Sequence, residues 1–204
     1  MTGLQFLVGG SYRHRAARLT ATALILLVLL GLAAGGEEEK RAPSFQLTNW
    51  DGQQVTLDSL AGKAAIVVFT YARCVYACPM VTGLLRDLDR SMGSPADLRF
   101  VHISVTPAED TAEEVRNHFR KFGIDPERDR RWLFLTGPDE DVASVLRDYG
   151  IEVERTPLGD GVLIQHTLRV LVLNRTGEVA ETFSTYVWDE KRMKNALSRS
   201  LAVQ

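Results

Sequence analysis

The run AAIVVFTYA, residues 64–72, places the strongest constraint on how this chain can fold. It is continuously apolar and rich in β-branched residues, which is typical of a strand buried on both faces. A short loop follows, Pro79 suits the first turn of a helix, and apolar side chains then recur at helical spacing from Val81 to Leu88. The stretch therefore predicts a core strand, a loop and a helix.

Strands and helices alternate along the rest of the domain. A hairpin signal at Asp51-Gly52 precedes the core strand, and Thr111 with Glu114 forms a capping box at the start of a later helix. The other expected elements are strands at 97–105 and 131–137, helices at 111–123 and 139–150, a strand pair within 165–186 and a final helix at 188–201. This order predicts a thioredoxin-like α/β fold, with a mixed central sheet flanked by helices and an N-terminal β-hairpin.

The N-terminus differs in kind from the domain. Residues 1–18 are basic, residues 19–36 are apolar and uncharged, and residues 37–43 form a charged linker before a domain at 44–204. A helix spans a bilayer with about 20 apolar residues and a lower limit near 17. The basic flank predicts a cytoplasmic N-terminus, so residues 19–36 are either a single transmembrane anchor or a cleaved signal segment ending near Ala33–Gly36. Both alternatives place the domain on the periplasmic or extracytoplasmic side of a bacterial-type inner membrane.

The charge balance narrows the choice of partners. The chain has 24 basic and 26 acidic residues, for a formal net charge of −2. Nucleic-acid-binding proteins usually carry a basic stripe or have a high isoelectric point. We therefore expect no nucleic-acid partner.

Both cysteines of the chain, Cys74 and Cys78, fall in the loop between the core strand and its helix. If Pro79 is the first helical residue, Cys78 is the N-cap, where the helix dipole stabilises a thiolate. Three residues separate the cysteines, a wider spacing than the common redox motif. A structural disulfide, a redox pair and a metal clamp all remain open, although a disulfide across so short a loop contributes little loop entropy. Two thiolates suit Cu(I) or zinc, and a zinc site needs further ligands.

The four histidines offer one candidate for a third ligand. His14 lies in the basic N-terminus, and the polar neighbours of His118 predict a solvated side chain. His102 lies in the middle of a predicted strand, and we expect it to be packed in the core with a hydrogen bond. His166 falls where the turn-rich segment TPLGDGVLIQ meets a late strand. Loops before late strands of this fold approach the loop after the first core strand, so His166 is either a ligand facing the sulfurs or an ordinary strand-edge histidine.

An ordered set of fragments resembles the Sco/SenC family of membrane-tethered copper chaperones. CVYACP matches the family's Cys-x3-Cys-Pro, VHISVTPAEDT resembles its strand and DPERDT segment, and LTGPDEDVASVLRDYGI, TPLGDG and QHTLRVLVLNRTGEV follow in the family's order. The likeness covers nearly the whole domain. It implies copper ligation by Cys74, Cys78 and His166, as Cu(I) and in a second state Cu(II). It also implies delivery of copper to the Cu-A centre of a heme-copper oxidase, or reduction of the cysteines there, with a thiol reductant and a copper donor as further partners.

The chain departs from the family pattern at several positions. Thr106 and Gln165 stand where the family usually has aspartate, which predicts weaker Cu(II) binding with Cu(I) binding intact. Val75 and Tyr76 replace the family's Pro-Asp between the cysteines, so this chain is expected to differ from the family in client or in copper affinity. Two further functions stay open: an extracytoplasmic thiol–disulfide oxidoreductase that uses Cys74 and Cys78 without stable metal, and a peroxidase-like enzyme, for which no motif is present.

Overall fold

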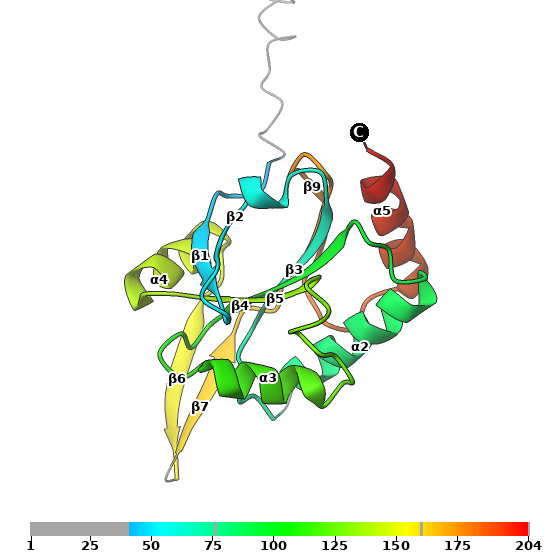
Figure 1. Cartoon of the computed structure of the whole chain (residues 1–204). Helices are drawn as coiled ribbons and strands as arrows, with labels where there is room; N and C mark the ends of the chain where they lie inside the picture. Colours follow the sequence, from blue (N-terminus) through cyan, green and yellow to red (C-terminus); the bar gives the residue numbers. More distant parts are fainter. Residues whose placement is uncertain (1–40, 76, 160, 204) are drawn as a thin grey trace, which may run out of the picture. The chain divides into compact units, whose positions relative to one another are not determined.

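A computed structural model of the chain describes residues 41–75, 77–159 and 161–203 (Figure 1). The predicted basic N-terminus, the anchor or signal segment at 19–36 and most of the linker lie outside the described residues. Within the described residues, no helix has the length and apolar character needed to cross a membrane.

A seven-stranded mixed sheet forms the centre of the domain, in the order β2-β1-β5-β4-β3-β8-β9. Strands β3, β4 and β5 are parallel, while β8 pairs antiparallel with β3 and β1 pairs antiparallel with β2 and β5. The bounds are β1 Gln46–Asn49, β2 Gln54–Thr56, β3 Ala64–Thr70, β4 Leu98–Ser104, β5 Trp132–Thr136, β8 Val170–Leu173 and β9 Val179–Phe183. The predicted leading hairpin, core strand and late strand pair are all present.

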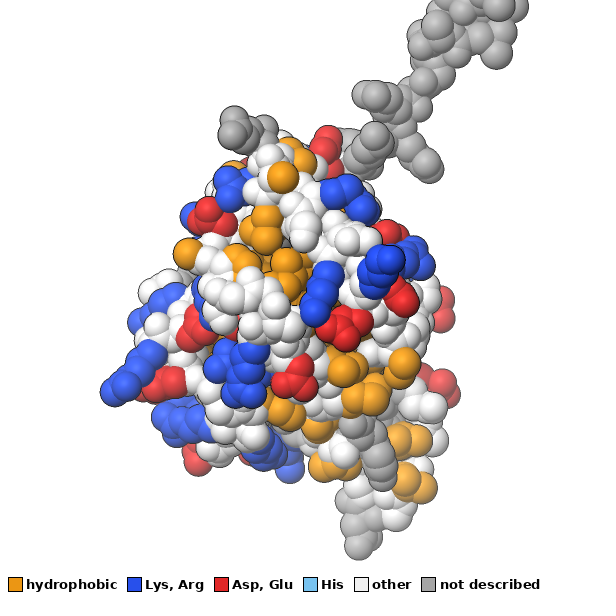
Figure 2. Space-filling view, turned by 90° about the vertical axis from the view of Figure 1, so that its right-hand side faces the viewer, with side chains coloured by type: hydrophobic (Ala, Val, Ile, Leu, Met, Phe, Trp, Pro, Cys, Tyr) orange, Lys and Arg blue, Asp and Glu red, His pale blue; other side chains and the backbone are white. Residues whose placement is uncertain are grey.

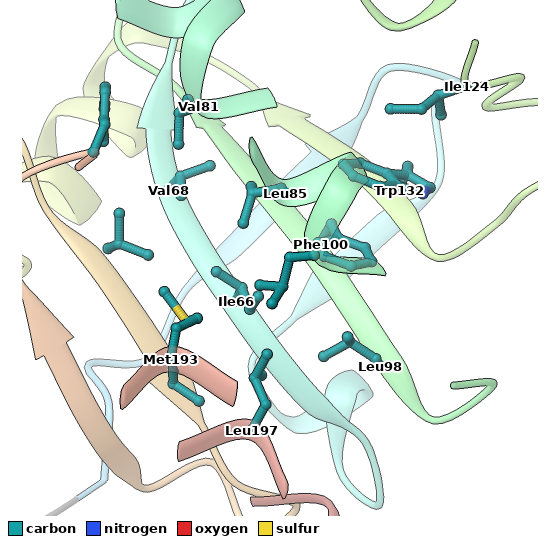
Figure 3. Close-up of a cluster of buried hydrophobic side chains, with 14 of the residues drawn as sticks. Ile66, Val68, Val81, Leu85, Leu98, Phe100, Ile124, Trp132, Met193 and Leu197 are labelled. Carbon is teal, nitrogen blue, oxygen red and sulfur yellow. The ribbon is translucent and has the colours of Figure 1, made fainter. Parts of the chain in front are cut away.

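Helices cover both faces of this sheet. They are α2 Ala77–Ser91, α3 Ala112–Arg120, α4 Asp139–Asp148 and α5 Glu190–Ala202, with a short 3-10 turn η1 at Asp58–Leu60. Every residue of β3 is buried, as its apolar run predicted. Its alternate side chains enter two separate cores. Ile66 and Val68 pack among residues of α2 and α5 (Figure 3). Val67 and Phe69 pack on the other face of the sheet with α4. The central strand therefore belongs to both halves of the interior.

Side-chain caps begin two helices, of which the Thr111 cap was predicted from the sequence. The Thr111 side chain accepts a hydrogen bond from the Glu114 N–H and caps α3, and Asp189 caps α5 in the same way. Each cap satisfies one N–H group that the first turn of a helix leaves without a partner. Gly150 follows α4 with φ 63°, a left-handed conformation that glycine adopts without a steric cost.

The segment expected to be a turn-rich loop is instead a second, two-stranded sheet. Strands β6 Val153–Leu158 and β7 Gly161–His166 pair antiparallel and extend below the rest of the domain in Figure 1. Most of their side chains are exposed or half-buried, so the strands carry no clear alternation of apolar and polar residues. Pro157 and Gly159 within the segment add turn signals, which hid the strands from a pattern-based reading.

Candidate metal and thiol site

The two cysteines lie where β3 ends and α2 begins. Cys74 is 7% exposed and Cys78 is fully buried as the second residue of α2, two positions further into the helix than the predicted N-cap. The backbone N–H of Cys78 points at the sulfur of Cys74, with 3.4 Å between nitrogen and Sγ. A sulfur that accepts an N–H group at a helix N-terminus is stabilised as a thiolate. Cys74 therefore holds the position in which negative charge is best accommodated.

Cys78 is suited to keep its proton. Its hydrogen bond with the Cys74 side chain, followed by burial, raises the pKa of the Cys78 thiol well above its ordinary value. A buried pair of sulfurs with one shared proton carries one negative charge rather than two. Ligation of a cation by both sulfurs must then release the Cys78 proton, since thiolates are the ligating form.

Two tyrosines border the sulfurs. The Tyr71 side chain hydrogen-bonds that of Cys74, and burial together with this bond raises the pKa of Tyr71. The buried Tyr186 donates from its hydroxyl to the carbonyl of Phe69, at 2.6 Å. Burial, followed by the charges of Cys78 and Cys74, raises the pKa of Tyr186 as well. Both phenols therefore stay neutral, and sequence reasoning passed over them because their contacts with the loop depend on how the chain folds back.

His166 is the last residue of β7 and lies half-buried, within electrostatic range of Cys74. Burial lowers the pKa of its imidazole, while the bond to the Thr167 carbonyl and the Cys74 charge oppose that shift. Its Nδ1 lies 3.0 Å from the Thr167 carbonyl oxygen, so a neutral ring donates from Nδ1. Histidines that bind metals commonly hold the other ring N–H in such a bond, which leaves the Nε2 lone pair for the ion.

The expectation of a solvated His118 is wrong. His118 is 1% exposed, and its Nε2 lies 2.8 Å from the hydroxyl of Thr82. Its ring also hydrogen-bonds the backbone carbonyl of Ala72, two residues before Cys74. The Thr82 hydroxyl in turn lies 3.1 Å from the Cys78 carbonyl oxygen. His118 thus braces both the loop that precedes Cys74 and the helical turn that carries Cys78, and burial lowers the pKa of His118 to about 4.

His102 is packed in the core as predicted, fully buried, with its Nδ1 3.3 Å from the hydroxyl of Thr70. Burial, followed by the charge of His118, lowers the pKa of His102 well below its usual value. The rings of His102 and Phe134 stack, with their centroids 6.1 Å apart. This residue is therefore part of the core and is remote from ligation.

A buried carboxylate lies behind the cysteine loop. Asp110 accepts from the Ala72 N–H at 2.8 Å, the Ser104 hydroxyl at 2.5 Å and the Thr106 hydroxyl at 3.2 Å. Burial raises the pKa of Asp110, and these three hydrogen bonds oppose the shift. Thr106, which replaces a family aspartate, is therefore used inside the protein, and Gln165, the second replacement, is exposed.

The described residues contain no group of three His, Cys, Asp or Glu side chains already gathered closely enough to hold a metal ion. The structure brings Cys74 and Cys78 together and places His166 on the Cys74 side of the pair. Two soft sulfurs and one neutral imidazole are the donors that Cu(I) prefers. The ligand set of Cys74, Cys78 and His166 stays a prediction, and its donor chemistry fits copper.

The mixed sheet and the cysteines at its first strand-to-helix junction define a thioredoxin-like domain equipped for thiol or soft-metal chemistry. The family model described as SCO1/SenC matches residues 33–202, and the chain belongs to this family. The solved structure of Bradyrhizobium japonicum ScoI with copper bound is similar, with a TM-score of 0.68 and 28% identity over 79% of this chain and 99% of that one.

Further relatives match most of the domain in sequence or in fold. The SCO1 protein homolog of Bacillus subtilis is 25% identical over 157 residues, 72% of this chain and 78% of the relative. The structure of BsSco, described as having a disulfide switch and belonging to the Sco family of cytochrome c oxidase assembly proteins, matches in fold with a TM-score of 0.65 at 20% identity, over 80% of this chain and 95% of that one. The chain spans 38% and 50% of the lengths of the mitochondrial relatives from Arabidopsis thaliana and Homo sapiens.

Proposed function

We propose that this protein binds copper through Cys74, Cys78 and His166 and delivers it to the Cu-A site of a heme-copper oxidase, or reduces the thiols of that site. The contact between the Cys78 N–H and the Cys74 sulfur at 3.4 Å carries the proposal, because it places two sulfurs together at a helix N-terminus. The copper-bound relative and the membership of BsSco in an assembly family support it. Copper is here the cargo, taken from a donor and released to the client.

The chain's own residues perform three tasks in this proposal. Cys74 offers the charged sulfur, Cys78 gives up its proton when the ion enters, and His166 supplies Nε2 while Thr167 holds the ring through Nδ1. Oxidation of the two thiols to a disulfide would remove both sulfur ligands, so a thiol reductant is needed to restore the binding form.

Copper stoichiometry of the reduced protein tests this function. We expect about one Cu(I) per chain, as set by a single site, and at least a tenfold loss of affinity in Cys74→Ser, Cys78→Ser and His166→Ala. Gln165→Ala is the matched control, because it removes an exposed neighbour of His166 and should leave the stoichiometry unchanged. Wild-type protein that takes up no Cu(I) after full reduction would refute the copper proposal.

A thiol–disulfide oxidoreductase without stable metal is the second candidate. The proton retained on Cys78 and the use of Thr106 inside the protein favour it, since a classical pair of carboxylate donors is missing from the site. This function predicts a Cys74–Cys78 reduction potential above about −300 mV, within the range of exchange catalysts. A lower potential would identify an inert structural bridge.

We further propose that residues 19–36 attach the domain to the bacterial-type inner membrane or export it, so that the domain works on the periplasmic side. The basic residues before this apolar segment support that orientation. Reporter fusions at the C-terminus, one active only in the periplasm and one only in the cytoplasm, test it. Size comparison of the mature protein with the full chain then separates an anchor from a cleaved segment.

A further inference from the structure

Exposed apolar side chains line a groove beside the cysteine loop. Val75, between the cysteines, is 75% exposed, and Leu158 and Val162 at the end of the β6–β7 hairpin are 64% and 55% exposed. All three line one groove of about 470 Å³, together with Tyr71, Arg73, Glu109, Gly161, Leu163 and Ile164. In Figure 2, hydrophobic side chains gather toward the bottom of the face, at the height where Figure 1 shows the hairpin and the start of α2. Contiguous exposed apolar surface of this kind marks an interaction site.

The shape of the groove suits an extended chain. The groove is lined by the consecutive residues Gly161–Ile164 of β7 and by the cysteine loop, which contributes Arg73 and Val75. Strand β7 pairs only with β6 among the described strands, so its sheet has no further strand partner. A peptide in extended conformation can lie along such a strand, with alternate side chains in the apolar pockets. Its course would lead directly to the cysteine loop.

The charges of the groove indicate what this peptide carries. Glu109 is neutralised by Arg155, with 2.8 Å between the guanidinium nitrogen and the carboxylate oxygen. Arg73, exposed beside Cys74, has no ion-pair partner within the described part of the chain. The uncompensated charge of the groove is therefore positive, and complementary recognition calls for an acidic side chain in the occupant.

We propose that this groove is the docking surface for the client, and that it takes an extended client segment with apolar side chains and an acidic residue next to the client's thiols. The proposal rests on the proposed function, because it assumes a client that exchanges copper or electrons with Cys74 and Cys78. Arg73 and Val75, the residues on either side of Cys74, line the groove, so docking brings the client's thiols next to the more exposed of the two sulfurs.

Site-specific photo-crosslinking of the full chain in its own membrane tests the docking surface. A photo-reactive amino acid is introduced at position 75, at position 162, or at position 187 as a control. Val187 is 71% exposed, a close match to Val75, and does not line the groove. We expect positions 75 and 162 to give an adduct with one thiol-bearing protein, identified by mass spectrometry, and position 187 to give roughly tenfold less of it.

Substitutions in the groove complete the test. Leu158→Ser should lower the adduct at position 162 roughly tenfold, and Arg73→Glu should lower it to a similar extent, whereas Val187→Ser should leave it unchanged. Four results would each overturn the proposal. They are adducts formed only with a second copy of this chain, equal yields from position 187, yields that do not change in Leu158→Ser, and no adduct from either groove position. Repeating the crosslinking with Cys74→Ser and Cys78→Ser separates binding of the client in the groove from copper or thiol exchange at the cysteines. Adducts that persist in these variants would show that docking does not require the sulfurs. Adducts formed by wild-type protein that takes up no Cu(I) after full reduction would leave the groove standing and reject the copper function.

Discussion

Acidification should expose the cost of burying His118. The imidazole is 1% exposed, and burial lowers its pKa from 6.5 to about 4. Well above pH 6.5 it is neutral in both the folded and the unfolded chain and contributes no pH dependence. Below that value His118 binds a proton in the unfolded chain but stays neutral in the folded protein, so stability falls as pH falls. The shift corresponds to a loss of about 2 kcal/mol between pH 7 and pH 5 and about 3 kcal/mol by pH 4.

Urea unfolding at a series of pH values measures this loss, with tryptophan fluorescence as the signal. His118→Gln should lower stability at pH 7 because its hydrogen bonds are altered, yet it should lose about 2 kcal/mol less than wild type between pH 7 and pH 5. His102 remains buried in both proteins, so some pH dependence persists. Asn117→His places an exposed imidazole on the same helix and should leave the slope as in wild type. If the free energy of unfolding of His118→Gln falls with pH as steeply as that of wild type, with equal m-values, the reasoning is refuted.

Three further predictions concern buried polar contacts. Asp110→Ala leaves the Ala72 N–H and two hydroxyls without their acceptor and should cost about 3 kcal/mol or more, read from the urea midpoint, with Asp110→Asn costing less. Arg131→Met should cost about 3–5 kcal/mol, because Asp89 is fully buried and accepts from Arg131 through both oxygens; a loss below about 1 kcal/mol by the same assay would contradict it. Tyr186→Phe removes one hydrogen bond to β3 and should cost about 1 kcal/mol in thermal unfolding, with no change in copper stoichiometry if the phenol is structural.

The order of elements could be predicted because the local patterns agree with the fold. The β-branched run of β3, the capping pair Thr111 and Glu114, and Pro79 in the first turn of α2 each carry their signal within a few residues. The position of the two cysteines at the junction of a strand and a helix followed from the same patterns. The helical spacing of Val115, His118 and Phe119 places His118 on the buried face of α3. Its charged neighbours nevertheless led to the prediction of a solvated side chain.

The rest of the site depends on contacts between distant segments. Asp110 reaches Ala72 across 38 positions of the chain, and Tyr186 reaches Phe69 across 117. Neither contact leaves a periodic trace in the sequence. The β6–β7 hairpin escaped prediction for a different reason, because strands with both faces largely in solvent have no hydrophobic alternation to detect.

Strand β7 connects the groove with His166, the proposed third ligand. Its residues Gly161–Ile164 form a wall of the groove, and the strand ends two residues later at His166. Under the proposed function, an occupant that displaces the strand would also move the His166 imidazole relative to Cys74, and part of the free energy of docking would go into withdrawing this ligand from the ion. Coupled binding equilibria are reciprocal, and an ion held by His166 would change the affinity of the groove by the same factor. The β6–β7 hairpin would then couple release of copper to binding of the client.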